Sequence, residues 1–312
     1  MDTFVHQSVL TREALALLQP RSGGVYADAT LGGAGHTLAI LEASAPDGRV
    51  VAVDRDPRAI EHARARLAPY GDRVQVMHGD FGELPGLLQA AGHARVDGII
   101  ADLGVSSPQL DAAERGFSFM HAGPLDMRMD TSRGETALEL IDRLSESELS
   151  DVIFRYGEER RSRAISRSIH RAHNAGELAT TEDLRLAVQR AIGRPPGAKT
   201  DPATRTFQAL RIAVNREVDE LRALIACLAD VLEDGGVAVL ISFHSIEDRI
   251  VKHAFRDDAR LLPLVKRPVI AGEEEQANNR RSRSAKLRAA ERRPRMLDAE
   301  GEYGDDHEAA QA

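Results

Sequence analysis

The chain has 312 residues, 42% hydrophobic and 29% charged, which is enough to bury the core of one large domain or two smaller ones. Its single cysteine, Cys227, excludes an internal disulfide framework and a cysteine-based zinc site, and no apolar run reaches membrane-spanning length, so we expect a cytoplasmic protein without membrane contact. The net charge of −8 argues against a nucleic-acid partner, but residues 278–295 hold eight Lys or Arg against one Glu, a local basic patch that suits phosphate contact.

The first third of the chain alternates short apolar runs with helical patterns. The apolar runs cover residues 24–30, 49–56, 73–81 and 97–106. Short buried runs separated by helices are typical of a parallel sheet with crossover helices. This part of the sequence therefore predicts an open α/β fold.

The alternation stops between residues 111 and 216, which are helical, charged and loop-rich. It resumes with an amphipathic helix from residue 218, which we expect Gly235 and Gly236 to end, followed by a strand over 237–243. Residues 263–270 and 284–292 are expected to form a final strand pair. We infer a discontinuous α/β domain (1–110 and 217–295), a mostly helical inserted domain (111–216) and a disordered acidic tail (296–312).

The segment DATLGGAGHT, residues 28–37, joins the first predicted strand to the first helix. Such a loop is a turn with a capping Asp or a ligand-binding loop. Asp54 ends the second strand, where an acid can bind ribose hydroxyls. The phosphate-binding lysine of a nucleoside triphosphatase is absent, and the loop departs from the dinucleotide-binding pattern G-x-G-x-x-G. S-adenosylmethionine is therefore the leading candidate ligand.

Two further strand ends carry side chains that suit the same ligand. Asp80 and Phe81 follow the third strand, where an acid or an aromatic ring could meet an adenine, and Asp102 ends the fourth. Ligands of open α/β sheets bind at the carboxyl ends of the strands, so these residues predict one nucleoside pocket.

Seven long strings of the chain closely resemble the bacterial RsmH (MraW) family of S-adenosylmethionine-dependent methyltransferases. They are DATLGGAGHT, AVDRDP, DLGVSSPQLDAAERGFSFMHAGPLDMRMD, YGEERRSRAISRSI, PATRTFQALRIAVNRE, GGVAVLISFHSIEDRIVK and RSAKLRAAER, and the resemblance runs from His6 to about Arg293. It implies a class I methyltransferase fold with an inserted substrate-recognition domain. It also implies methylation of the exocyclic N4 of one cytidine in the decoding (P-site) region of 16S ribosomal RNA, with an assembled small subunit as acceptor.

Carried over residue by residue, the resemblance implies a set of cofactor-binding positions. They are Gly33, Ala34, Gly35, His36, Asp54, Phe81, Asp102 and Gln109. The chain departs from the family pattern at Ala122, Asp201 and Arg280, where an acid, a His and a Pro are usual, and Ser8 stands where Pro is common. None of these departures falls on a cofactor position.

The catalytic candidates follow the fourth and fifth strands. The N4 amine of cytosine is a poor nucleophile, so the enzyme must align it with the methyl group and accept hydrogen from it. Asp102 is expected to orient the cofactor or the amine, with Ser106 or Ser107 near the base, although either serine could simply cap a helix. His244 could contact the base or be a structural histidine. No metal ligand set is expected.

The acceptor RNA is expected to contact basic residues of the insert and of the C-terminal patch. The candidates are Arg160, Arg163, Arg167, Arg205, Phe207, Arg281 and Arg283. On sequence alone the first three fit an ordinary solvated helix face, and the resemblance to an RNA-modifying family reverses that preference.

Two other functions remain open at this stage. A non-catalytic ribosome-assembly factor could keep the cofactor fold, but intact Gly33, Gly35, Asp54 and Asp102 argue against it. A DNA cytosine-N4 methyltransferase is weakened because Gln109, and no aromatic residue, follows Ser-Pro. The sequence does not specify the oligomeric state, and a homodimer is compatible with it.

Overall fold

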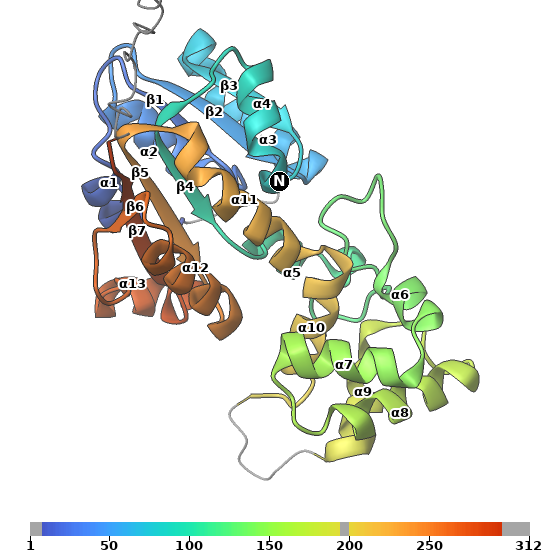
Figure 1. Ribbon diagram of the computed structural model, residues 1–312. Coiled ribbons are helices and arrows are strands. Elements are labelled where there is room, and N and C mark those ends of the chain that lie inside the picture. The colour runs from blue at the N-terminus through green and yellow to red at the C-terminus, as the bar shows by residue number, and fades with distance from the viewer. Residues whose placement is uncertain (1–7, 194–199, 295–312) are drawn as a thin grey trace, which may run out of the picture.

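The computed structural model describes residues 8–193 and 200–294 and consists of an α/β domain joined to a helical lobe (Figure 1). Within these ranges one seven-stranded sheet has the order β3-β2-β1-β4-β5-β7-β6. Its strands are β1 (Val25–Asp28), β2 (Arg49–Asp54), β3 (Val74–His78), β4 (Val96–Asp102), β5 (Leu232–Ser242), β6 (Leu261–Pro263) and β7 (Lys286–Arg292). Strands β1 to β5 are parallel, and β7 pairs antiparallel with both β5 and β6. This order confirms the expected α/β class.

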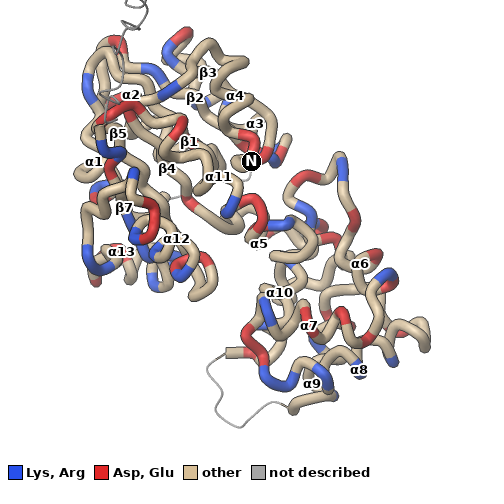
Figure 2. The backbone as a smooth tube through the Cα atoms, in the orientation of Figure 1, with Lys and Arg blue, Asp and Glu red and all other residues tan. Residues whose placement is uncertain are grey.

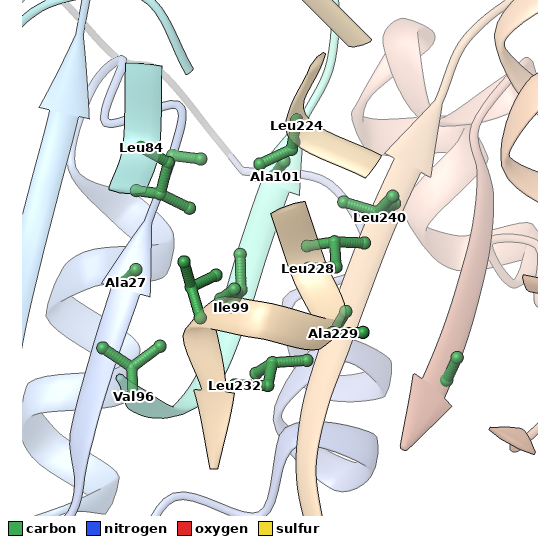
Figure 3. Close-up of a cluster of buried hydrophobic side chains, with 14 of the residues drawn as sticks. Ala27, Leu84, Val96, Ile99, Ala101, Leu224, Leu228, Ala229, Leu232 and Leu240 are labelled. Atoms are coloured by element: carbon green, nitrogen blue, oxygen red, sulfur yellow. The ribbon is translucent and has the colours of Figure 1, made fainter. Parts of the chain in front are cut away.

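Helices cover both faces of the sheet because its central strands are apolar on both sides. In β4, Ile99 and Ala101 pack into one buried cluster and Ile100 into the other, as alternation along a strand requires. The first face carries α4 (Leu84–Ala90), α11 (Glu217–Val231) and α12 (Ser245–Asp257), and the second carries α1 (Thr11–Leu18), α2 (Gly35–Ala43) and α3 (Pro57–Leu67). Figure 3 shows the first cluster, where Leu84, Leu224 and Leu228 lie over the sheet.

The end of α11 corrects the expectation for Gly235 and Gly236. The helix ends at Val231, and β5 begins at the next residue, so both glycines lie inside the strand. The register against β4 shifts between Leu232 and Val237, which marks a bulge, and Gly235 has a positive φ of 80° there. The glycines therefore bend a strand and do not cap a helix.

The final strand pair forms between other residues than expected. Strand β6 spans only Leu261–Pro263, and the predicted strand over 263–270 contributes a single bridge from Val269 to Leu287. Between β6 and β7 the chain forms α13 (Glu273–Asn278) and the short helix η4 (Arg280–Arg283).

The inserted segment folds around its own apolar core. Five helices surround it: α6 (Ala137–Arg143), α7 (Glu146–Gly157), α8 (Ser162–Asn174), α9 (Thr181–Ile192) and α10 (Thr204–Val214). Their buried side chains include Leu140, Ile153, Ile165, Leu184 and Leu210, which all belong to one cluster separate from the two beneath the sheet. In Figure 1 these helices lie at the lower right, away from the sheet.

Buried polar contacts connect this lobe to the sheet domain. Arg115, in the short helix η3 (Ala113–Arg115), donates from Nη1 to Oδ2 of Asp56 at 2.8 Å, and both side chains are 4% exposed. Asn215, after α10, bonds to the backbone of Met127 and Met129, and its own carbonyl accepts from Arg55 at 2.8 Å. Both ends of the lobe are therefore bonded to the two residues that follow β2.

Some expectations fall outside the described residues or concern membranes. The acidic tail predicted over 296–312 lies outside the described ranges. Within residues 8–193 and 200–294, none of the helices has the length and apolar character that crossing a bilayer requires.

Candidate cofactor and active site

A pocket opens at the carboxyl edge of the parallel strands, where ligands of open α/β sheets bind. The space between its lining atoms is about 770 Å³, which includes volume open to solvent. Residues after five strands or on facing helices line it: Ala29, Thr30, Gly32, Asp54, Arg55, Ala59, Gly79, Phe81, Asp102, Leu103, Gly104, Val105, Ser106, Gln109, Met129, Glu217, Leu221, Glu247 and Arg281.

Buried hydrogen bonds fix the glycine loop that follows β1. Asp28 accepts from Oγ1 of Thr37 at 2.6 Å and from the backbone N–H of Thr30 at 3.1 Å. The N–H of Gly32 donates to Asp54 at 2.7 Å, and Oγ1 of Thr30 accepts from the N–H of Asp102 at 2.6 Å. The loop is therefore held to the ends of β2 and β4.

The predicted loop residues Gly33, Ala34, Gly35 and His36 lie beside the pocket and are not among the residues that line it. Ala34 is fully buried with a positive φ of 64°, and α2 starts at the next residue. His36 is 4% exposed, and its Nε2 lies 4.0 Å from the Asp102 carboxylate. Their contact with the cofactor stays a prediction.

Gly35 lies against Ser8, which suggests a test of the loop. A Cβ atom on Gly35 would be 2.1 Å from Oγ and 3.0 Å from Cβ of Ser8. We expect Gly35→Ala to lower the free energy of unfolding by about 1–3 kcal/mol, the cost of overpacking, and to weaken cofactor binding. Urea unfolding and calorimetric titration measure the two effects.

Two further variants control for the chemistry of this change. Gly86→Ala, where a Cβ would meet nothing within 4 Å, is expected to leave cofactor binding unchanged. The double variant Ser8→Gly/Gly35→Ala removes the obstructing side chain and should restore binding. Weak binding by the double variant would show that the loss does not come from the Ser8 contact.

The β2 and β3 side of the pocket suits an adenosine. The Asp54 carboxylate accepts from Gly32 and from the N–H of Asp56 at 2.8 Å, which leaves one lone pair on each oxygen for ribose hydroxyls. Phe81 starts the short helix η2 (Phe81–Glu83) and lines the pocket. Gln109 is 7% exposed and is held by Asp56 and by the N–H of Ser106.

Asp102 is the most distinctive group in the pocket. Its side chain is 7% exposed, and its Oδ1 is buried with no hydrogen-bond partner. Burial raises the pKa of Asp102 to about 7, against the opposing charge of Arg281. A buried carboxylate oxygen without a partner is costly, so the position favours a ligand that brings a positive charge or a donor. The ammonium and sulfonium groups of S-adenosylmethionine meet this requirement.

The raised pKa of Asp102 predicts that cofactor binding depends on pH. A cation binds the ionised carboxylate and competes with its proton, so S-adenosylmethionine should bind about eightfold more weakly at pH 6 than at pH 7.5. The folding stability of the protein without bound cofactor should change with pH in the opposite direction. Because the pKa is raised on folding, the contribution of Asp102 to stability declines as the pH rises from about 4 to about 7.

Calorimetric titration across this pH range measures the first effect. Burial also raises the pKa of Asp28 and of Asp54 to about 6, so both add to the change near pH 6. The Asp102→Asn variant isolates the contribution of Asp102. If this variant kept the full pH dependence, the titrating group would be another acid.

The structure separates the three other catalytic candidates. Ser106 lines the pocket and caps α5 (Ser107–Asp111) together with Gln109, so its contact with a base stays a prediction. Ser107 lies in a neighbouring hollow and not in this pocket. His244 does not line the pocket either. Its Nδ1 caps α12, accepting from the N–H of Glu247 at 3.4 Å, which is the structural role weighed beside the catalytic one.

The β4 and β5 side of the pocket carries two acids, Glu217 and Glu247, that were not expected from the sequence. Oxygens of Glu217 and Glu247 and a ring nitrogen of His244 lie within 4.8 Å of one another, a grouping that could hold a metal ion. However, Arg211 donates to both Glu217 oxygens at 2.8 Å, and His244 lies 3.1 Å from Glu247. The positive charge among these acids is thus supplied by Arg211.

Two arginines line the pocket that were not expected there: Arg55 was not singled out from the sequence, and Arg281 was assigned to RNA contact. Arg281 was expected to contact RNA, but it lines this pocket beside Asp102. Arg55 directly follows Asp54 in the string AVDRDP and contacts Asp80 and the carbonyl of Asn215. Its position in the string marked it as near the site, but nothing in the sequence showed which way it points.

The predicted RNA-binding residues divide into exposed and buried groups. Arg160, Arg163, Arg167, Arg205 and Arg283 are exposed. Figure 2 shows basic and acidic positions interspersed on this lobe, and Arg167 lies 3.4 Å from Glu146. Phe207 corrects the prediction: it is 5% exposed and packs edge-on against Phe119 in the core of the insert, so its ring is not available for stacking on a base.

Asp201, a departure from the family pattern, is engaged within the insert. Its carboxylate lies 3.3 Å from Arg185 and accepts from Gln189 at 3.1 Å and from the N–H of Ala203 at 2.9 Å. These contacts give Asp201 a structural role before α10.

Comparison with known proteins yields a consistent set of relatives. The model of the MraW methylase family matches residues 3–293. Ribosomal RNA small subunit methyltransferase H of Sorangium cellulosum (strain So ce56) is 60% identical over 287 residues, 92% of this chain and 90% of that protein. The protein of the same name from Geotalea uraniireducens (strain Rf4) is 48% identical over 94% of this chain and 100% of its own length.

Solved structures of methyltransferases also match the chain. The crystal structure of precorrin-6y C5,15-methyltransferase from Geobacter metallireducens aligns over 94% of this chain and 93% of its own, with 11% identity and a TM-score of 0.45.

Proposed function

Because this chain belongs to the MraW methylase family, we propose that it transfers a methyl group from S-adenosylmethionine to small-subunit ribosomal RNA. We further propose the exocyclic N4 of one cytidine in the decoding (P-site) region of 16S ribosomal RNA as the acceptor, in an assembled small subunit in the cytoplasm. The names of the two relatives support the coarser statement, and the resemblance of the strings supports the finer one.

The chain is a class I methyltransferase, and S-adenosylmethionine is its cofactor. When bound, the cofactor supplies an electrophilic methyl group on a positively charged sulfur. The residues present fit this group: Asp54 offers acceptors to a ribose, Phe81 lines the pocket with an aromatic side chain that suits an adenine, and Asp102 offers a carboxylate to a cation. Oδ1 of Asp102, buried without a partner, is the observation that carries the proposal.

Asp102 is assigned mainly to binding the cofactor, and contact with the amine of the acceptor base is its second role. Its carboxylate at the end of β4 lies between the glycine loop and the segment Gly104 to Ser106, where the acceptor would enter. The same carboxylate can accept hydrogen from an incoming amine, which must lose a proton when nitrogen gains the methyl group. Within the described part of the chain, the exposed arginines of the insert would add phosphate contacts.

A labelling experiment tests the proposal. Small subunits from a strain that lacks the modification are incubated with the protein and S-adenosylmethionine labelled in the methyl group. The RNA is then digested and the labelled nucleoside identified. We expect a single labelled cytidine methylated at N4. Label on another base, or label in naked 16S RNA but not in subunits, would contradict the finer proposal and leave the methyltransferase activity standing.

A further inference from the structure

Met129 brings the inserted lobe into the cofactor pocket. Of the described residues in the insert, which spans 111–216, it alone belongs to the pocket lining. The residue is 6% exposed and is also part of the buried apolar cluster around which the five helices of the insert pack. One side chain therefore contributes both to the core of the insert and to the wall of the pocket.

Two contacts of Arg55 place Met129 on the adenosine side of the pocket. Arg55 directly follows Asp54, the acid that suits a ribose, and its Nη1 lies 4.0 Å from Sδ of Met129. Its Nε donates to Asp80, which directly precedes Phe81. Met129 is therefore close to the two strand ends, those of β2 and β3, whose residues suit the adenosine of the cofactor.

Two buried side chains fix the backbone that carries Met129. Oδ1 of Asn215 accepts from the N–H of Met129 at 2.7 Å, and its Nδ2 donates to the carbonyl of Met127 at 2.7 Å. Nη2 of Arg115 donates to the carbonyls of Arg128 at 3.0 Å and Met129 at 2.8 Å. Met127 is fully buried with a positive φ of 62°, a conformation that persists only where the surroundings hold it. Met129 therefore cannot leave the pocket unless these hydrogen bonds break.

A thioether at this position suits the adenine ring. Methionine sulfur is polarisable and packs favourably against aromatic rings. We propose that Met129 packs against the adenine of S-adenosylmethionine, and that cofactor binding thereby stabilises the insert in its folded position against the sheet domain. The inference rests on the cofactor of the proposed function and does not depend on which RNA base accepts the methyl group.

Thermodynamic linkage makes this contact a connection between the two domains. When the insert opens locally, Met129 leaves the pocket and the cofactor loses a contact. A ligand that binds the closed form more tightly shifts the population toward it, and the coupling factor is the same in both directions. Cofactor binding should therefore oppose opening of the insert by the factor by which loss of the Met129 contact weakens cofactor binding. The insert is then best ordered for the RNA once the methyl donor is bound.

The first test measures cofactor binding by calorimetric titration of the full chain. We expect Met129→Ala to raise the dissociation constant of S-adenosylmethionine about 3- to 10-fold, the range for one sulfur contact with an aromatic ring. The dissociation constant of 5′-methylthioadenosine, which keeps the adenosine and lacks the amino-acid end, should rise by the same factor. Met129→Leu keeps most of the side-chain volume and should bind both ligands more tightly than Met129→Ala does.

Met127→Ala is the matched control. Met127 belongs to the same buried cluster and the same short segment, but it does not line the pocket. Both alanine variants remove a methionine from the core of the insert and should lower its stability. Only Met129→Ala should change the affinity for the two ligands by more than about twofold.

The second test needs no variant and follows hydrogen exchange of backbone amides in the parent protein. Amides of α6 to α10 that exchange through opening of the insert alone should exchange about 3- to 10-fold more slowly at saturating S-adenosylmethionine, the reciprocal of the affinity loss. In Met129→Ala this slowing should disappear.

Three outcomes would overturn the inference. They are affinities of Met129→Ala within twofold of the parent values, an equal loss of affinity in Met127→Ala, and exchange of the insert amides in the parent that S-adenosylmethionine does not slow. Each measurement uses the protein and a small ligand without RNA. Failure to label cytidine N4 would instead contradict the proposed function, so the two failures are distinguishable.

Discussion

Replacing Arg115 with alanine is expected to lower the free energy of unfolding by about 3–5 kcal/mol, the usual cost of removing one member of a buried ion pair. The Asp56 carboxyl, 4% exposed, would lose the Arg115 donor at 2.8 Å. Two carbonyls of the insert, those of Arg128 and Met129, would lose the second guanidinium nitrogen. Chemical denaturation followed by circular dichroism measures the loss.

The ion pair of Arg58 with Glu114 provides a matched control. Its two side chains lie 3.0 Å apart but are 60% and 61% exposed, so Arg58→Ala should change stability by less than about 1 kcal/mol. The double variant Asp56→Asn/Arg115→Met removes both buried charges and should recover part of the loss. Equal losses of stability in Arg58→Ala and Arg115→Ala would show that burial of the Arg115–Asp56 ion pair does not add to its contribution.

Replacing Asp102 with asparagine is expected to slow methyl transfer by about 100- to 1,000-fold, the range for removing one preorganised electrostatic group from an active site. The amide keeps the shape of the side chain but loses the negative charge beside the cationic methyl donor. Its oxygen can still accept a hydrogen bond, but an amide cannot take up the proton that the amine must lose. Single-turnover assays at saturating S-adenosylmethionine separate the slower transfer from weaker binding.

Asp97 offers a control on the same strand. It lies near the opposite edge of β4, where it accepts from Arg21 at 2.6 Å and from the N–H of Val25 at 2.8 Å, far from the pocket lining. Asp97→Asn should leave the rate of methyl transfer unchanged. A rate for Asp102→Asn equal to that of Asp97→Asn would remove Asp102 from the proposed mechanism.

The sequence predicted the part of the site that depends on parallel strands. Alternating apolar runs and helices place every strand end at one edge, so Asp54, Phe81 and Asp102 were expected together and do line one pocket. Gln109 and Ser106 follow β4 closely enough to share that edge. For these residues, position along the chain was sufficient because local order determines where they lie.

The remaining part depends on contacts between distant residues. Arg281 and Arg283 are two positions apart in the same basic string, but one lines the pocket and the other is exposed. Which of them points inward depends on the turn of η4 against Phe243, and composition does not show this. Phe207 was misassigned for a similar reason, since its partner Phe119 lies 88 positions earlier, counting from 119 to 207.

The reversed direction of β7 also affects when the site can assemble during synthesis. The carboxyl ends of the parallel strands lie at the edge of the sheet that carries the pocket. Because β7 is antiparallel, its amino end lies at that same edge, so the segment before Lys286 reaches the edge where the loop after β1 lies. About 250 residues separate Gly32 from Arg281 along the chain, although both line the pocket. The pocket is therefore completed only after the ribosome has translated past Arg281, so a partial chain that already contains Asp54, Phe81 and Asp102 would still lack the part of the pocket wall that Arg281 forms.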